Sequence, residues 1–181
     1  MAEQIIKAKK GIKKSFFEVR APMTATKIQL YAGAAEELEG KVVKLDLTRS
    51  LKGKNFELRM KVVKKEDTLE AEPVSLALAG SYIRRMMRTG IDYIEDSFVV
   101  DMKDGKARVK PFMITRNKVS RAVRNEIRNG ARKFVEEHFK TRTQKEMFNE
   151  VMTNKIQKEL FVRLKKVYPL ALCEIRAFEL E

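Results

Sequence analysis

The sequence predicts an α+β fold, in which an antiparallel, barrel-like sheet is followed by about three packed helices and a returning C-terminal strand. Apolar and polar residues alternate through much of the first half of the chain, which is typical of strands with one buried face. From Asn117 the apolar residues follow the 3.6-residue period of a helix, and alternation returns after Pro169. Strands, then helices, then a strand is the order expected of an α+β domain.

Two strands of the first half are clear in the pattern, and a third contains a proline. Residues 43–48 and 56–62 each place apolar side chains at alternate positions, with polar and mostly charged residues between them. In residues 69–78 the apolar positions change parity at Pro73. Because proline cannot donate a hydrogen bond to a strand ladder, we expect a bulge or a bend there.

The strongest local pattern is SFVVDMKDGKARVKPF at residues 97–112. Asp104-Gly105 favours a two-residue hairpin turn between two strands. If Lys103 pairs with Lys106, apolar residues face apolar residues and an acid faces a base, so this register is self-consistent.

The helical elements follow from capping and stop signals as well as from periodicity. A short helix is predicted at 81–89, and a long one runs from residue 117 to about residue 140. Thr143-Gln144-Lys145-Glu146 is a capping box that starts the next helix, and a last helix at about 155–167 is stopped by Pro169. The predicted organisation is a basic disordered tail at 1–14 and one domain at 15–181, which is strand-rich at 15–115, helical at 116–168 and closed by a strand at 170–179.

Charge is the outlying feature of the composition. The 181 residues include 39 Lys and Arg against 25 Asp and Glu, which gives a net charge of +14 and a pI near 9.9. Such a field attracts polyanions, of which nucleic acid and an anionic membrane surface are the two main kinds. The 44% hydrophobic content is enough for a core. No apolar leader region is visible, and no run approaches the about 20 apolar residues of a spanning helix, so we expect a cytoplasmic protein without a membrane partner.

The long predicted helix carries a second, basic stripe. On a helical wheel of about 100° per residue, Val119, Val123, Ile127 and Phe134 form the expected core face, with Gly130 among them. About 140° to 220° from Val119 lie four arginines, named here the arginine ladder: Arg121, Arg124, Arg128 and Arg132.

The ladder favours a phosphate-binding function. Like charges one turn apart destabilise a helix by about 0.2–0.5 kcal/mol per pair, so the partner that neutralises them should lie outside the helix. A guanidinium group fits phosphate with two parallel hydrogen bonds, and four of them along a helix can follow a phosphate backbone. A merely solvated basic face is the alternative.

Further basic residues complete the set of candidate RNA contacts. The tail supplies five lysines, the short helix three arginines, the hairpin two cations and the start of the helical half two more. In order these residues are Lys7, Lys9, Lys10, Lys13, Lys14, Arg84, Arg85, Arg88, Arg108, Lys110, Arg116 and Lys118. Lys165 and Lys166 are left out, because the C-terminus of a helix favours cations for electrostatic reasons of its own.

Catalytic and metal-binding patterns are not visible in the sequence. His138 is the single histidine and lies near the expected core face, so a hydrogen-bonded structural histidine is the better interpretation. Cys173 is the single cysteine and is expected to be a small buried apolar residue. With no phosphate-binding glycine loop and no nucleophile motif, we expect neither enzyme activity nor a cofactor. The absence of tryptophan and of interleaved aromatics predicts recognition of backbone and shape rather than of bases.

Five segments together resemble one family of ribosomal proteins, the archaeal and eukaryotic small-subunit family called S-three-a-e, or eukaryotic-type small-subunit protein one. The resemblance runs from residue 13 to residue 178, and the short C-terminal end is similar to archaeal members. The five segments are KKSFFEVRAP at 13–22, GKVVKLDLTRSL at 40–51, IRRMMRTGID at 83–92, VVDMKDGKARVKPFMITR at 99–116 and VYPLALCEIR at 167–176.

The resemblance implies a role that the residues alone do not reach. It implies a structural ribosomal protein of the platform, near the messenger exit and the 3′ end of the small-subunit RNA. The implied partners are ribosomal RNA and neighbouring ribosomal proteins, with messenger RNA at the exit as a further candidate. The alternatives are a peripheral protein of anionic membranes, an RNA-binding protein outside the ribosome and an enzyme acting on nucleic acid.

Overall fold

The computed structural model describes residues 14–24, 26–51, 54–65 and 68–181, and these form two compact units. Unit 1 contains the described residues up to Val42 together with Lys61–Glu72, and unit 2 contains Val43–Met60 and Pro73–Glu181. The single domain expected over residues 15–181 stays a prediction, and the sequence pattern gave no sign of these two units. The predicted tail lies outside the described residues, apart from Lys14.

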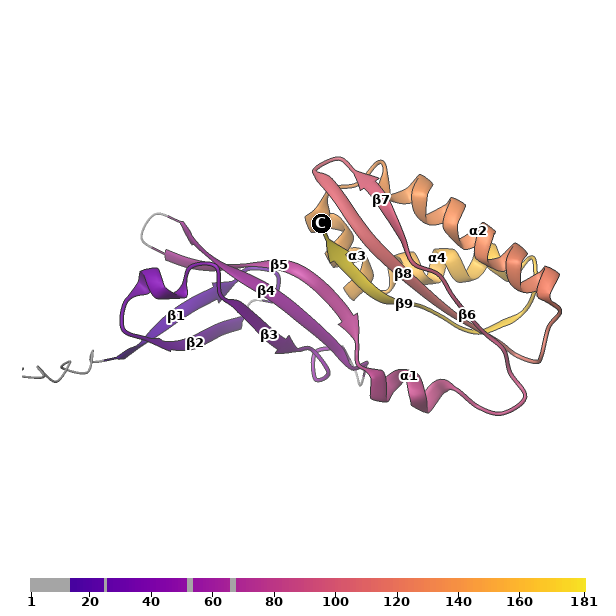
Figure 1. The fold of residues 1–181 in the computed structure, drawn as a ribbon, viewed down its shortest axis with the longest axis horizontal. Coiled ribbons are helices and arrows are strands. Elements are labelled where there is room, and N and C mark those ends of the chain that lie inside the picture. The colour runs from indigo at the N-terminus through magenta and orange to yellow at the C-terminus, as the bar shows by residue number, and fades with distance from the viewer. Residues whose placement is uncertain (1–13, 25, 52–53, 66–67) are drawn as a thin grey trace, which may run out of the picture. The chain divides into compact units, whose positions relative to one another are not determined.

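The α+β class and the returning C-terminal strand are confirmed. In the described chain, nine strands and four α-helices are present, and the strand path β2-β1-β5-β9-β8-β6 leaves the sheet open (Figure 1). The expected barrel-like closure is therefore not seen, and the sheet is mixed because β1 runs parallel to β5. The elements before the first α-helix are β1 (Ser15–Ala21), β2 (Thr26–Ala32), a 3₁₀ helix (Ala35–Leu38), β3 (Val42–Asp46), β4 (Phe56–Lys65) and β5 (Thr68–Leu78).

Unit 1 is built around the β1–β2 hairpin. The strands pair without a register shift from Ser15↔Ala32 to Ala21↔Thr26, and residues of alternating parity therefore lie on opposite faces. Val19 and Ala21 are buried on one face, whereas the opposite face is exposed. This hairpin was not identified from the sequence, because its apolar residues do not alternate cleanly.

The predicted alternation holds in β4 and changes phase in β5. Phe56, Leu58 and Met60 are fully buried, and the charged residues between them are exposed. In β5 the buried apolar residues change from odd to even positions on either side of Pro73, as expected, and the strand continues through this proline. The two units also divide at Pro73. The bulge itself stays a prediction.

The hairpin of unit 2 forms, but the predicted register is wrong. β7 (Phe98–Met102) and β8 (Gly105–Thr115) pair with Asp101 opposite Lys106 and Met102 opposite Gly105, so the two turn residues are Lys103 and Asp104. The two registers differ by two residues, which leaves every side chain on the same face. Hydrophobic patterning therefore could not separate them.

Contacts from outside the hairpin hold its tip in the observed register. Gln144 donates a side-chain hydrogen bond to the carbonyl oxygen of Asp104 at 3.1 Å, and its backbone N–H donates to the Asp104 carboxylate at 3.4 Å. Gly105 has a φ of +147°, which a residue with a Cβ rarely adopts. The turn is thus held by the first residue of the third α-helix, 40 residues further along the chain.

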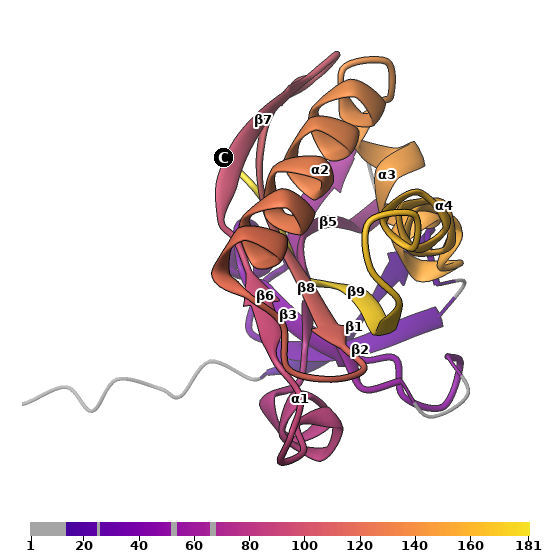
Figure 2. The ribbon, with the colours of Figure 1, turned by 90° about the vertical axis from the view of Figure 1, so that its right-hand side faces the viewer.

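Three helices cover the sheet of unit 2 (Figures 1 and 2). A core forms between the sheet and the helices from side chains that include Ile94, Met113, Ala131 and Leu160. The capping box at Thr143–Glu146 is confirmed at the start of α3. The remaining elements are α1 (Gly80–Met86), β6 (Tyr93–Glu95), α2 (Arg121–Phe139), α3 (Gln144–Met152), α4 (Lys155–Leu164) and β9 (Leu170–Leu180).

The closing strand β9 is buried on both faces at Cys173, Glu174 and Ile175, and its register against β8 shifts after them. Lys110 pairs with Ala177 and Pro111 pairs with Ile175, so Arg176 is an extra residue on β9. Beyond this shift, Phe178 packs edge-on against Phe148 of α3, with ring centroids 4.7 Å apart. Cys173 is buried in the core as expected, and burial raises the pKa of its thiol to about 12.

Candidate nucleic-acid interface

The face of α2 that is buried in the structure differs from the face predicted from the sequence, and it lies closer to the arginine ladder. Ile127, Ala131, Val135 and Phe139 form the fully buried spine at a spacing of four residues. Val123 and Phe134 are only partly buried against the core. α2 is covered by the sheet on one side and approached by α4 on the other, and a single apolar stripe did not reveal this double contact.

The middle two ladder arginines are consequently half-buried. Arg124 and Arg128 lie beside the spine, and both are intermediate in exposure. Arg128 donates to the side chain of Asn125 at 3.3 Å. The Nε of Arg124 is buried and has no hydrogen-bond partner among the described residues. These two side chains border the core rather than forming a separate solvated stripe.

Arg132 has a partner within its own helix, contrary to the expectation that the neutralising groups lie outside it. Its Nε lies 3.3 Å from a carboxylate oxygen of Glu136, one turn further along α2. Its guanidinium group also lies over the ring of Phe98 in β7, at 5.1 Å from the ring centroid. Only Arg121, the first residue of α2, is an exposed ladder arginine that forms no ion pair with a described carboxylate.

The two hairpin cations are neutralised by carboxylates in β9 and directly after it. Arg108 donates to Glu181 through two nitrogens at 2.8 and 3.1 Å, and Lys110 lies 3.3 Å from Glu179. Such partly exposed pairs contribute little stability, but each carboxylate cancels a charge that would otherwise face a polyanion. The structure therefore gives these two candidates a partner that the sequence did not show.

Several cations without a carboxylate partner among the described residues lie where the segment after α1 meets the segment between β8 and α2. The segment after β8 runs beside residue 92, because Asp92 accepts hydrogen bonds from the backbone N–H groups of Thr115 and Val119 at 2.9 Å each. This arrangement brings Arg88 and Arg116 to the lining of one pocket of about 430 Å³. We call five exposed cations of these segments and of the helices next to them the basic end: Arg84, Arg88, Arg116, Lys118 and Arg121. None of them forms an ion pair with a carboxylate in the described residues.

Two other candidates have more limited freedom. Arg85 donates to Asn55 at 3.2 Å and lies over the ring of Tyr82 at 5.7 Å from its centroid, so α1 and the loop before β4 hold it in place. Lys14, the one described lysine of the predicted tail, is exposed in unit 1 with its Nζ 5.8 Å from the ring centroid of Tyr31.

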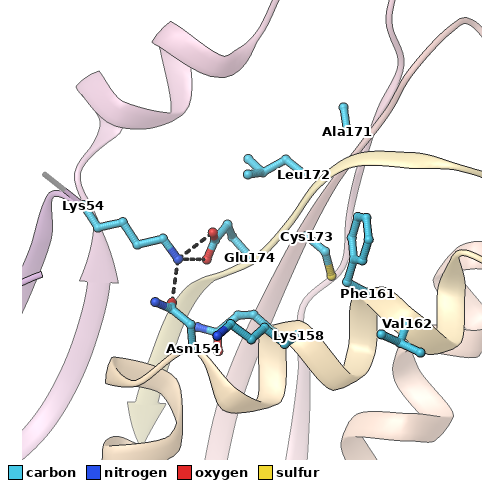
Figure 3. Close-up of a pocket in the computed structure, with 10 residues that line it drawn as sticks. Lys54, Asn154, Lys158, Phe161, Val162, Ala171, Leu172, Cys173 and Glu174 are labelled. Atoms are coloured by element: carbon cyan, nitrogen blue, oxygen red, sulfur yellow. Dashed lines mark hydrogen bonds and ion pairs between the residues drawn. The ribbon is translucent and has the colours of Figure 1, made fainter. Parts of the chain in front are cut away.

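A buried ion pair, which the sequence did not reveal, lies on another side of unit 2. The Nζ of Lys54 lies 2.6 Å from both carboxylate oxygens of Glu174 and also donates to the side chain of Asn154 (Figure 3). Burial raises the pKa of Glu174, and Lys54 offsets part of that effect. Together these residues border a pocket of about 540 Å³, which Phe161 also lines. Lys54 is paired to a carboxylate, whereas Lys158, which also lines this pocket, has no ion pair among the described residues.

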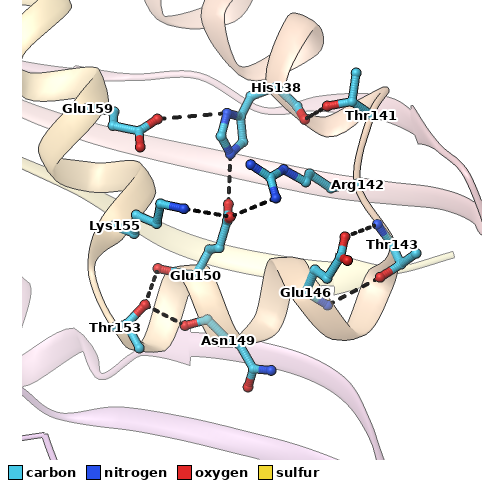
Figure 4. A network of polar contacts seen from close by, with 10 residues as sticks. All are labelled: His138, Thr141, Arg142, Thr143, Glu146, Asn149, Glu150, Thr153, Lys155 and Glu159. Atoms are coloured by element: carbon cyan, nitrogen blue, oxygen red, sulfur yellow. Dashed lines mark hydrogen bonds and ion pairs between the residues drawn. The ribbon is translucent and has the colours of Figure 1, made fainter.

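His138 is a hydrogen-bonded structural histidine, as predicted. Its Nε2 lies 2.7 Å from a carboxylate oxygen of Glu150, and the other oxygen lies 3.4 Å from Arg142 and 3.6 Å from Lys155 (Figure 4). Burial alone would raise the pKa of Glu150, but the hydrogen bond and charge of His138, together with the two cations, lower it. The cluster ties α2, α3 and α4 together.

Within the described residues, no group of three or more His, Cys, Asp or Glu side chains is arranged to hold a metal ion. Among the described helices, none is long and apolar enough to cross a membrane.

Comparison with known proteins gives one consistent family. The Ribosomal S3Ae family matches residues 4–181. Small ribosomal subunit protein eS1 of Nanoarchaeum equitans is 30% identical over 177 residues, which cover 93% of this chain and 89% of that protein. The protein of the same name from Methanothermobacter thermautotrophicus is 30% identical over 95 residues, which cover 52% of this chain and 49% of that protein. The one from Saccharolobus islandicus is 29% identical over 132 residues, which cover 72% of this chain and 64% of that protein. The chain belongs to the Ribosomal S3Ae family.

Proposed function

We propose that the protein is a structural constituent of the small ribosomal subunit and that it binds ribosomal RNA through the basic end of unit 2. The family supports the ribosomal part of this proposal, since the archaeal relatives are named as small-subunit proteins. The ribosome is cytoplasmic, and its RNA and neighbouring proteins are the partners. We further propose a position on the platform near the messenger exit, with messenger RNA as a candidate contact.

One observation carries the RNA-binding part of the proposal. Among the candidate cations, those of the basic end are exposed and have no carboxylate partner in the described residues, whereas Arg108, Lys110 and Arg132 have one. An unpaired arginine keeps its planar set of donors available for phosphate, and no ion pair with a carboxylate has to be broken when the phosphate binds. The five lysines of the tail are proposed to add phosphate contacts in the same way.

Sedimentation tests the ribosomal part directly. A tagged chain, expressed in the cells from which it comes, should move with the small subunit through a sucrose gradient at high salt and should be absent from the large subunit. Recovery at the top of the gradient would contradict a structural role. Crosslinking within the purified subunit should then map RNA to the basic end, and a crosslink pattern limited to the opposite side of unit 2 would exclude this interface.

A further inference from the structure

Unit 1 carries a pair of aromatic side chains whose exposure is unusual. Phe16 of β1 and Tyr31 of β2 lie directly opposite each other in the strand register, with ring centroids 5.0 Å apart and an angle of 47° between the rings. Phe16 is 72% exposed and Tyr31 is 56% exposed. Each ring therefore keeps much of its surface in water, although it has an aromatic neighbour.

The core of unit 1 does not need this pair. Val19 and Ala21 of β1 and Ala32 of β2 are buried, and Phe16 points away from Val19 because residues three positions apart on a strand lie on opposite faces. A cross-strand aromatic pair is worth only a modest stabilisation when so much of its surface remains wet. Stability of the fold therefore gives little reason for two large apolar rings on this face.

The charged residues around the two rings indicate which kind of partner can bind to this face. The Nζ of Lys14 lies 5.8 Å from the ring centroid of Tyr31. Arg20 and Lys27 lie opposite each other in the strand register, four residues from Phe16 and Tyr31 on the same face. Glu18 of this face lies 3.1 Å from Lys27, and Glu70 of β5 lies beside Arg20 in the strand register but is paired with Lys65 at 2.9 Å. Lys14 and Arg20 have no ion pair with a carboxylate in the described residues, so the face offers two available cations to an anionic partner.

We propose that this face stacks unpaired bases of single-stranded RNA on the rings of Phe16 and Tyr31, while Lys14 and Arg20 hold the flanking phosphates. Single-stranded nucleic acid presents both a negative backbone and flat apolar bases, and aromatic rings beside cations match the two together. Stacking of this kind tolerates any base sequence, because every base has a flat face. The inference rests on the proposed function, since it deepens RNA binding, but it uses a separate set of residues in unit 1.

Two RNA-like probes of equal length separate stacking from charge. Oligouridylate has unstacked bases, whereas an abasic ribose-phosphate oligomer has the same backbone without bases. The intact chain should bind oligouridylate about tenfold or more tightly than the abasic oligomer at one salt concentration. The double variant Phe16→Ala/Tyr31→Ala should lose that preference and keep its affinity for the abasic oligomer. Phe16→Leu/Tyr31→Leu keeps apolar bulk at both positions without flat rings, and it should lose the preference as well.

Tyr93 supplies the matched control, since it is an exposed tyrosine of unit 2 at 54% exposure. Tyr93→Ala should keep the full preference for bases. The proposal is overturned if the intact chain shows no preference, or if the preference survives in both double variants.

A fluorescent reporter gives an independent measurement. The chain has no tryptophan, so Phe16→Trp introduces a single one at the proposed stacking position. Its fluorescence should be quenched by oligouridylate and not by the abasic oligomer, and the control Tyr93→Trp, which lies next to the basic end, should respond equally to the two oligomers. Equal responses to both oligomers at Phe16→Trp would contradict stacking.

Failure of this inference can be told apart from failure of the proposed function. If the double variants keep the preference for bases but no longer enter the small subunit, the face docks a protein and the stacking proposal is wrong, while the ribosomal role stands. If the intact chain binds neither oligomer and does not sediment with the subunit, both proposals fail.

Discussion

The guanidinium group of Arg132 lies 3.3 Å from the carboxylate of Glu136 and 5.1 Å from the ring centroid of Phe98. Arg121, eleven positions earlier in the same basic stripe, is exposed and has no such carboxylate among the described residues. A helical wheel treats these two arginines as equivalent. Their neighbours show that one is part of the fold and the other is available to a partner.

We therefore expect Arg121→Gln and Arg132→Gln to differ in kind. Arg132→Gln removes an ion pair and a cation–π contact, and it should lower the free energy of unfolding by about 0.5–1.5 kcal/mol with little change in RNA affinity. Arg121→Gln should leave stability within about 0.5 kcal/mol and weaken RNA binding. Denaturant unfolding and RNA retention on filters measure the two quantities, and identical behaviour of both variants would contradict the distinction.

The Lys54–Glu174 pair should be far more sensitive to loss of one partner than a surface pair. Lys54→Met leaves a buried carboxylate without its cation, which typically costs about 3–5 kcal/mol. Because burial raises the pKa of Glu174, the variant should regain stability as the pH falls and the carboxyl becomes neutral.

Lys64→Met is the control for this prediction, since Lys64 and Glu36 form a 3.9 Å pair whose side chains are 40% and 82% exposed. Its loss should cost no more than about 1 kcal/mol. Equal losses of unfolding free energy for the two lysine variants, measured by denaturant unfolding, would show that burial does not make the Lys54 pair more important for stability.

Glu150 should make stability fall in acid. Its folded pKa is lowered below 4.5, so its contribution is present above the unfolded pKa and is lost as the pH falls through the folded value. Glu150→Gln should lower the free energy of unfolding by about 1.5–3 kcal/mol near pH 7, and the difference from the unmodified chain should narrow below pH 4.5.

The exposed carboxylate of Glu159 gives a matched comparison, because it lies 3.9 Å from the same histidine with its side chain 45% exposed. Glu159→Gln should have a small effect that changes little with pH. A Glu150→Gln difference that stays constant from neutral to acid pH would mean that the carboxylate is not stabilised by its cations.

Elements governed by local patterns could be predicted from the sequence, and those governed by distant contacts could not. The alternation of Phe56, Leu58 and Met60 and the Thr143–Glu146 capping box depend on neighbours in the chain, and both are confirmed. The β7–β8 register depends on Gln144, because a shift of two residues leaves the buried faces unchanged. The extra residue Arg176 in β9 likewise appears only once β8 is beside it.

The candidate site shows the same limit. Charge and spacing identified the basic residues, but pairing depends on carboxylates far along the chain, such as Glu181 for Arg108. Phe16 and Tyr31 come together only in the β1–β2 register, so the search for interleaved aromatics within one segment missed them. The alternation in SFFEVRA and TKIQLYA is interrupted by these same two aromatic residues, so it was only a weak signal of two facing strands.

The central claim is that unpaired cations, rather than positive charge in general, bind ribosomal RNA. Two variants with equal changes in net charge test it, each replacing five cations by Gln. One replaces the basic end, which is Arg84, Arg88, Arg116, Lys118 and Arg121. The other replaces five cations that have carboxylate partners, which are Arg108, Lys110, Arg132, Arg163 and Arg176.

The decisive measurement is the slope of log affinity against log salt concentration for small-subunit ribosomal RNA. Each lost phosphate contact flattens that slope by about 0.7–0.9, so loss of the basic end should flatten it by about 3.5–4.5 if all five residues make contacts. The variant with the paired cations replaced should keep a slope within about 1 of the unmodified chain. Equal flattening in the two variants would mean that net charge alone drives binding, and an unchanged slope in the first would mean that the basic end does not bind the RNA.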